Sequence, residues 1–425
     1  IGGSAARTAR GAAEQSEATM RAAAPKIDRF LRRAATFGLL ALVVTACAQQ
    51  SPRVAQRPET APTQTQTAAP GPRVAPGAPV RVALLAPRSA GSSRDQALAA
   101  DLEAAARLAV GDARGPGIEL SVYDTGADPA RAAQAARSAV ADGAAVIVGP
   151  LFRATTNAVR PVAQGAGVKV LSFSSDSGTG GDPVWVLGDL PENEVERVLG
   201  YAGSQGLRSL ALVTPRTEYG ALVEAEARRS AGRAGLAVVA AAPYERSPGG
   251  VERDVSAAAP QILSSGADAA LIADGGAALR TVAAFLAFND VLQPGVRYLG
   301  TGQWGTPGTE AEAPLRGGWF AQPDPAALER FAARFREAYG RAPDPLAGLG
   351  YDAVAVVDQL AAEARAAGSD RPFTPQAMTA RSYQGARGAF RLTQEGANRR
   401  ALAVMEVTAG GFVPLDPAPA VAPGS

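Results

Sequence analysis

The stretch that decides the fold begins with the apolar run Val80-Arg-Val-Ala-Leu-Leu-Ala86, which predicts a buried strand. The residues that follow alternate between helical patterns and further apolar runs. We expect helices over 96–112 and 129–142, and strands over 118–124 and 145–148. Strands that alternate with helices in this way are typical of an α/β protein with parallel sheets.

The same alternation continues along the chain. It predicts helices over 155–164, 193–205, 222–234, 251–264, 328–339 and 351–367, and strands over 169–173, 209–214, 237–241, 269–273, 296–299, 388–392, 402–407 and 412–415. A folded part of about 340 residues exceeds what one hydrophobic core usually serves, so we expect two Rossmann-like lobes. We assign 80–190 and 320–375 to the first lobe, 191–319 and 376–417 to the second, and 418–425 to a tail.

The amino-terminal segment has the pattern of a secretory signal. Residues 1–19 precede the first methionine, Met20, and we interpret them as an upstream extension. Residues 20–46 hold a basic region followed by an apolar one, and the apolar part is too short to span a bilayer as a helix. The run Val44-Thr-Ala-Cys47 resembles the lipobox of bacterial lipoproteins, which predicts that Cys47, the only cysteine, carries a lipid. Ala48 in the next position favours sorting to the outer membrane, with the protein on its periplasmic face.

The segment that follows, 47–79, is rich in proline, glutamine and threonine. Such a composition does not bury a core, and it predicts an extended tether between the lipid anchor and the domain 80–417.

The composition excludes several functions. The chain has no histidine, which rules out Ser-His-Asp catalysis and histidine-ligated zinc. A formal net charge of +2 without a basic block argues against nucleic-acid binding. We therefore predict a protein that is not an enzyme and that uses no cofactor and no metal.

One motif matches the dinucleotide-binding fingerprint. Gly300-Thr-Gly-Gln-Trp-Gly305 follows a predicted strand and has the G-x-G-x-x-G spacing. The fingerprint needs a helix directly behind the glycines, but Thr306, Pro307 and Gly308 stand there instead. We interpret the motif as a tight turn beside an interlobe cleft, with Trp304 packing there or lining the cleft.

Several segments, taken in order, resemble the type I periplasmic-binding fold of leucine-binding proteins. They are Val82-Ala-Leu-Leu-Ala-Pro87, Tyr123-Asp-Thr125, Val148-Gly-Pro150, Val170-Leu-Ser-Phe-Ser174, Ala211-Leu-Val-Thr214 and Gly350-Tyr-Asp-Ala353. The resemblance implies two lobes with parallel sheets, joined by three crossings, with a cleft between them.

Within that superfamily, some stretches resemble the lipoprotein activators of penicillin-binding proteins. They are Gly149-Pro-Leu-Phe-Arg-Ala-Thr-Thr156, Tyr298-Leu-Gly-Thr-Gly-Gln-Trp304, Arg316-Gly-Gly-Trp-Phe-Ala321 and Phe390-Arg-Leu392. The resemblance implies that the protein contacts a penicillin-binding protein and regulates peptidoglycan synthesis. The resemblance does not extend to the helical-repeat domain of the best-known activator.

The alternative is a substrate-binding lipoprotein of an amino-acid ABC transporter of the branched-chain type. In such binders, hydroxyls and backbone amides on two loops hold the solute's carboxylate. Asp176 falls where a hydroxyl would be expected, and Arg153 either offsets its charge or is solvated. The candidate cleft residues are Arg153, Thr155, Thr156, Ser174, Ser175, Asp176, Tyr219, Asp274 and Trp304.

Overall fold

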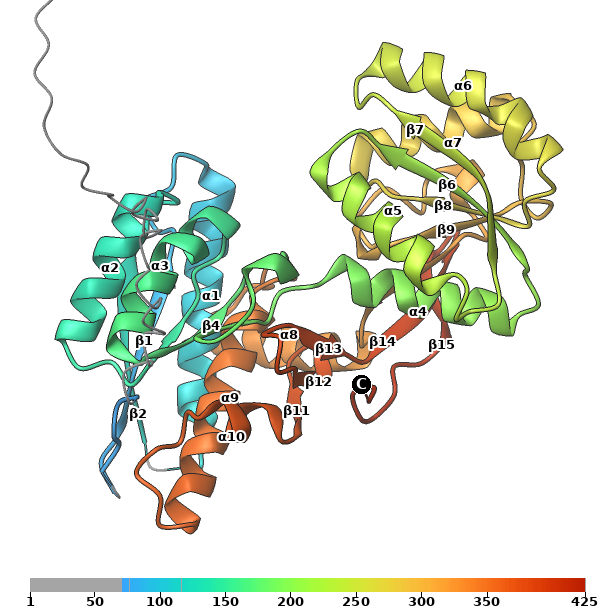
Figure 1. The fold of residues 1–425 in the computed structure, drawn as a ribbon. Helices are drawn as coiled ribbons and strands as arrows, with labels where there is room; N and C mark the ends of the chain where they lie inside the picture. The colour runs from blue at the N-terminus through green and yellow to red at the C-terminus, as the bar shows by residue number, and fades with distance from the viewer. Residues whose placement is uncertain (1–70, 76, 116, 425) are drawn as a thin grey trace, which may run out of the picture. The chain divides into compact units, whose positions relative to one another are not determined.

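The structure is a computed structural model that describes residues 71–424 apart from 76 and 116 (Figure 1). The predicted upstream extension, signal peptide, Cys47 and the tether up to residue 70 lie outside the described residues. Within the described part, no helix is both long enough and apolar enough to cross a membrane.

The first lobe is built on a five-stranded parallel sheet in the order β2-β1-β3-β4-β5. Its strands are β1 (Val80–Ala86), β2 (Ile118–Asp124), β3 (Val146–Val148), β4 (Lys169–Ser172) and β5 (Val184–Val186). One face packs on α1 (Ser93–Asp112) and α9 (Gly348–Ala366), and the other on α2 (Pro129–Ala141) and α3 (Arg153–Ala166). The sheet is therefore buried on both faces, as its apolar runs predicted.

The second lobe is built on a seven-stranded sheet in the order β15-β14-β10-β9-β8-β6-β7. Its parallel strands are β6 (Ser209–Pro215), β7 (Ala237–Tyr244), β8 (Ala269–Ile272), β9 (Arg297–Gly300) and β10 (Trp319–Pro323). The antiparallel strands β14 (Leu402–Thr408) and β15 (Gly411–Asp416) complete one edge. The faces are covered by α4 (Pro191–Ser204) with α5 (Glu218–Ser230), and by α6 (Pro248–Ser264) with α7 (Gly276–Phe288).

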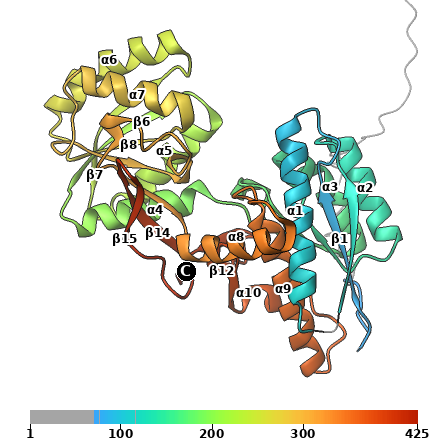
Figure 2. The same cartoon turned by 180° about the vertical axis from the view of Figure 1, so that it is seen from behind.

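Within the described residues, three segments connect the lobes. The first leads from β5 into α4, the second from β10 into α8 (Pro325–Tyr339), and the third from β13 (Asn398–Arg400) into β14. The two lobes with parallel sheets agree with the predicted α/β class. Figure 2 shows the same elements from behind.

A small antiparallel sheet of β11 (Ser382–Gly385), β12 (Gly388–Leu392) and β13 packs on the core of the first lobe, close to α10 (Pro375–Thr379). Tyr383, Phe390 and Leu392 are buried there. The predicted lobe boundaries therefore need two corrections. Residues 376–400 pack with the first lobe because their apolar side chains complete its core, and β10 belongs to the second because it pairs with β9 and β14.

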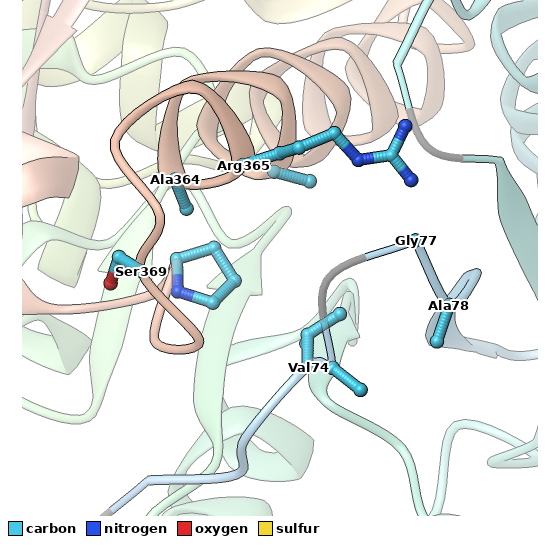
Figure 3. A pocket seen from close by; sticks show the side chains of 9 residues that line it. Val74, Gly77, Ala78, Ala364, Arg365 and Ser369 are labelled. Carbon is cyan, nitrogen blue, oxygen red and sulfur yellow. The ribbon is translucent and has the colours of Figure 1, made fainter.

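The end of the predicted tether packs on the first lobe. The backbone N–H of Val74 donates to the carbonyl of Asp370 over 2.8 Å, and Arg73 lies 3.3 Å from the Asp370 carboxylate. Figure 3 shows Val74, Gly77 and Ala78 opposite Ala364 and Arg365 at the end of α9. The cavity between them is about 10 Å³, room for no more than one water. The folded domain therefore begins before Val80.

Candidate functional site

The candidate site lies at the carboxyl ends of the parallel strands, where open α/β sheets bind their ligands. In the first lobe, the loop after β3 leads directly into α3 at Arg153. Phe152 caps this helix without a side-chain hydrogen bond. The first backbone N–H groups of α3 therefore have no side-chain partner at the cap, and together with the helix dipole they favour an anion at this end.

Arg153, the first residue of α3, pairs with a carboxylate of each lobe. Its guanidinium lies 3.4 Å from the carboxylate of Asp176, on the loop after β4. It also forms an ion pair with Glu218, the first residue of α5 in the second lobe. Of the two alternatives for Arg153, the structure shows the pair with Asp176, and Glu218 is a third charged group at the same place.

The two threonines beside Arg153 point inward. Both are fully buried, and their hydroxyls donate to the carbonyl of Phe152 over 2.8 Å from Thr155 and 3.0 Å from Thr156. The Thr156 hydroxyl also lies 2.8 Å from that of Ser172. The prediction that these hydroxyls are free to hold a ligand carboxylate is therefore wrong, since the start of α3 turns them into the lobe.

The serines of the second loop differ from each other. Ser174 is buried, and its hydroxyl accepts the backbone N–H of Asp176 over 3.2 Å. Ser175 is exposed. Asp176 also caps the short 3-10 turn Ser177–Thr179 by accepting the N–H of Gly178 over 2.9 Å. The Asp176 carboxylate is therefore held in place by the turn as well as by Arg153.

In the second lobe, Tyr219 is partly buried near the start of α5. Its hydroxyl lies 2.7 Å from the hydroxyl of Thr301, which follows β9. Burial, followed by the nearby Glu194 carboxyl, raises the pKa of Tyr219 well above its ordinary value of 10. The phenol therefore stays neutral and fixes the loop after β9 to α5.

Asp274, just after β8, is buried, and two neighbouring side chains pair with its carboxylate. It accepts a 2.6 Å hydrogen bond from the Tyr244 hydroxyl and lies 2.9 Å from the guanidinium of Arg246. Its charge is therefore balanced inside the second lobe. The structure places Asp274 in this cluster rather than beside Arg153.

Trp304 is fully buried in the core of the second lobe, where its indole N–H donates to the carbonyl of Ile272 over 3.3 Å. Of the two roles considered for it, packing is the one observed. Packing explains the glycines at 300 and 302. A Cβ would overlap the Trp304 ring at Gly300 and the Glu194 carboxylate at Gly302. The 3-10 turn Gly302–Trp304 begins at the second glycine, where dinucleotide binding would need a helix.

Glu194 is a buried carboxyl that the sequence analysis missed. It lies in the first turn of α4, at the first crossing, and accepts the N–H of Gly302 over 3.0 Å. Burial raises its pKa to about 8, and the neighbouring Asp189 carboxylate adds to this rise. Acidic residues in a first helical turn usually face water, so the sequence carried no sign of this burial.

Residues 79–411 match the family model of periplasmic binding proteins, and the chain belongs to this family. Comparison with curated proteins finds no match.

Solved structures of the same fold agree with this assignment. A branched-chain amino acid ABC transporter periplasmic ligand-binding protein from Burkholderia xenovorans is 18% identical, with a TM-score of 0.63 over 79% of this chain and 94% of that one. An ABC transporter solute-binding protein from R. palustris, in complex with benzoate, is 21% identical, with a TM-score of 0.57 over 81% and 98%. The substrate-binding protein LivJ from Streptococcus pneumoniae, in complex with isoleucine, is 17% identical, with a TM-score of 0.56 over 80% and 100%. At these identities, the likeness establishes the fold alone.

Proposed function

We propose that the protein is the substrate-binding component of an ABC transporter and that it binds a small solute with a carboxylate, first of all a branched-chain amino acid, without catalysing a reaction. The observation that carries this proposal is the position of Arg153. It stands at the helix terminus after β3, with no side-chain cap, and reaches a carboxylate of the other lobe. The solutes named for two similar structures, benzoate and isoleucine, both contain a carboxylate.

In this mechanism the carboxylate of the solute takes the place of Glu218 at Arg153. It then also accepts hydrogen bonds from the first N–H groups of α3, which the N-cap residue Phe152 leaves without a side-chain cap. The ammonium group of an amino acid pairs with Asp176, which its turn already holds beside Arg153. The buried threonine hydroxyls take no part.

The test is a thermal-shift and calorimetric screen of the full chain with leucine, isoleucine and benzoate. The binding of each acid is compared with that of the corresponding amide. We expect at least one acid to bind and its amide to fail. Arg153→Ala should abolish binding, whereas Arg137→Ala, on the exposed face of α2, should not. Equal binding of an acid and its amide would contradict the proposed role of Arg153, and no binding of any solute would count against the transport function.

A second candidate function is regulation of a penicillin-binding protein by protein contact, in peptidoglycan synthesis. The inward-turned hydroxyls of Thr155 and Thr156 favour it. Because these hydroxyls donate to the Phe152 carbonyl, the loop after β3 offers a solute carboxylate fewer hydrogen-bond donors than a transport function predicts. Capture of a penicillin-binding protein by the full chain, together with faster glycan polymerisation, would support this function. Solute binding without capture would contradict it.

We also propose that Cys47 carries the lipid that anchors the protein to the periplasmic face of the outer membrane. The basis is the sequence Val44-Thr-Ala-Cys47 behind a basic and apolar segment. Mass spectrometry of the protein from membranes should show a diacylglyceryl group on Cys47. Cys47→Ser should release the protein from the outer-membrane fraction, and its retention there would contradict the anchor.

A further inference from the structure

We propose that residues 417–424 form a strap, a non-covalent fourth link between the lobes that limits their rotation about the three crossings. This inference does not depend on the proposed function. It concerns the face of the crossings where β13, β14 and α4 meet, not the strand ends around Arg153.

One end of the strap is fixed to the second lobe. The chain leaves β15 at Asp416, whose carboxylate lies 2.8 Å from the guanidinium of Arg197 on α4. The same guanidinium donates to the carbonyl of Leu402 over 2.7 Å, at the start of β14. Arg197 therefore ties the origin of the strap to the third crossing.

The other end is fixed to the small sheet on the first lobe. The side-chain amide of Gln384 donates to the carbonyl of Ala420 over 2.8 Å, and the N–H of Ala422 donates to the hydroxyl of Ser382 over 3.3 Å. Ser382 and Gln384 both lie on β11, the edge strand of that sheet. In Figures 1 and 2 the dark red chain leaves β15 and turns toward the strands of this sheet.

The strap borders a hollow of about 390 Å³. Its lining includes Arg399 and Leu402 beside the third crossing, and Pro417, Pro419 and Pro423 of the strap. Ala418 packs against the core of the second lobe and Ala422 is buried, whereas the other described residues from Pro417 to Pro423 are exposed.

The prolines explain why this segment remains a strap. Proline fixes φ near −65° and has no N–H, so the segment, which bends at Ala420 and Val421, does not pair with the free edge of β11 as a further strand. Three prolines in eight residues leave the segment few backbone conformations. Because Asp416 and Ser382 belong to different lobes, a rotation that moves them apart must straighten the bend or break the contacts on β11.

The experiment measures the distance between the lobes by spin-label spectroscopy. The full chain carries Cys47→Ser, so that two new cysteines at exposed positions, Ala130→Cys on α2 and Glu252→Cys on α6, are the only labelled sites. We expect deletion of residues 417–425 to broaden the distance distribution at least twofold. The double variant Ser382→Ala and Gln384→Ala, which removes the side-chain contacts at one end, should broaden it in the same sense but less.

Val421→Ala is the matched control, because this side chain is 64% exposed, and it should leave the distribution unchanged. If the truncated chain fails to fold, the double variant at Ser382 and Gln384 tests the proposal in its place. An unchanged distribution in a folded variant that lacks either the strap or its contacts on β11 would overturn the proposal.

Discussion

Arg153, at the start of α3 in the first lobe, forms an ion pair with Glu218, at the start of α5 in the second. The Arg153 side chain is 52% exposed and that of Glu218 is 84% exposed. Water screens such a pair, which makes it worth about 0–1 kcal/mol. In the proposed function, a solute carboxylate with additional hydrogen bonds from α3 would therefore compete well against Glu218 for the same guanidinium.

The first prediction follows from this competition. Glu218→Gln removes the competing charge but keeps the shape of the side chain, so the affinity for the solute should rise by up to about fivefold. Titration calorimetry with the acid found in the screen measures the change. Glu245→Gln, another exposed residue on a loop of the same lobe, should have no effect. Weaker binding by Glu218→Gln would mean that Glu218 holds the solute itself.

The second prediction concerns pH and the buried carboxyl of Glu194. Its pKa is raised from the ordinary 4.5 to about 8 in the folded protein, mainly by burial. Below about pH 4.5 the carboxyl is protonated in both states. As the pH rises from there toward 8, only the unfolded chain ionises, so this group lowers the stability of the folded state by up to about 1.4 kcal/mol per pH unit.

Glu194→Gln should remove this loss, so the stability of the variant should fall less than that of the wild type between pH 6 and pH 8. Urea unfolding at both pH values measures the difference. Glu196→Gln, two residues further along α4 and much more exposed, is the matched control. The same pH slope in Glu194→Gln and in the wild type would show that the Glu194 carboxyl is ionised in the folded state.

Much of the fold could be predicted because the alternation of apolar runs and helical patterns is a local property of the chain. Several elements were not predicted, among them α7, α10, β5, β10, β11 and β13. The helix α7 contains Ala277-Ala-Leu and Val282-Ala-Ala-Phe-Leu, so it is apolar on most sides and shows no clear helical period.

The lobe boundaries and the site were harder to predict because they depend on tertiary contacts. Nothing local shows that Tyr383 and Phe390 complete the first lobe while β14 joins the second. The sequence placed Arg153 and Asp176 on neighbouring loops, and the structure brings them together. It could not show that Thr155 and Thr156 turn inward, since that direction depends on where α3 begins.

The third prediction concerns the buried ion pair between Asp352 on α9 and Arg400 on β13. The two groups are 3.1 Å apart, and the side chains are 0% and 1% exposed. Asp352→Asn leaves the buried guanidinium without its counter-charge and should cost about 3–5 kcal/mol of unfolding free energy. The double variant with Arg400→Met should recover part of this loss. Glu119→Gln, which removes a surface pair with Arg81, should cost less than about 1 kcal/mol.

An equal loss in the single and double variants would contradict this account of the pair. It would assign the cost to the 2.6 Å hydrogen bond that Asp352 accepts from the backbone N–H of Ala386, since both variants alter this bond in the same way.

The fourth prediction concerns Gly300, the first glycine of the motif that matches a dinucleotide fingerprint. A Cβ at this position would overlap the indole of Trp304, which is enclosed by the core of the second lobe and has no room to retreat. Gly300→Ala should therefore cost about 1–3 kcal/mol of stability. Gly249→Ala, where a Cβ meets open space, should cost little or nothing.

A double-mutant cycle tests the cause of this cost. Trp304→Phe alone should destabilise the protein, because the smaller ring leaves a cavity and loses the hydrogen bond to Ile272. In that background Gly300→Ala should cost clearly less than in the wild type, because the methyl group gains space where the indole stood. Equal costs in both backgrounds would mean that backbone conformation, and not the Trp304 ring, requires glycine at position 300.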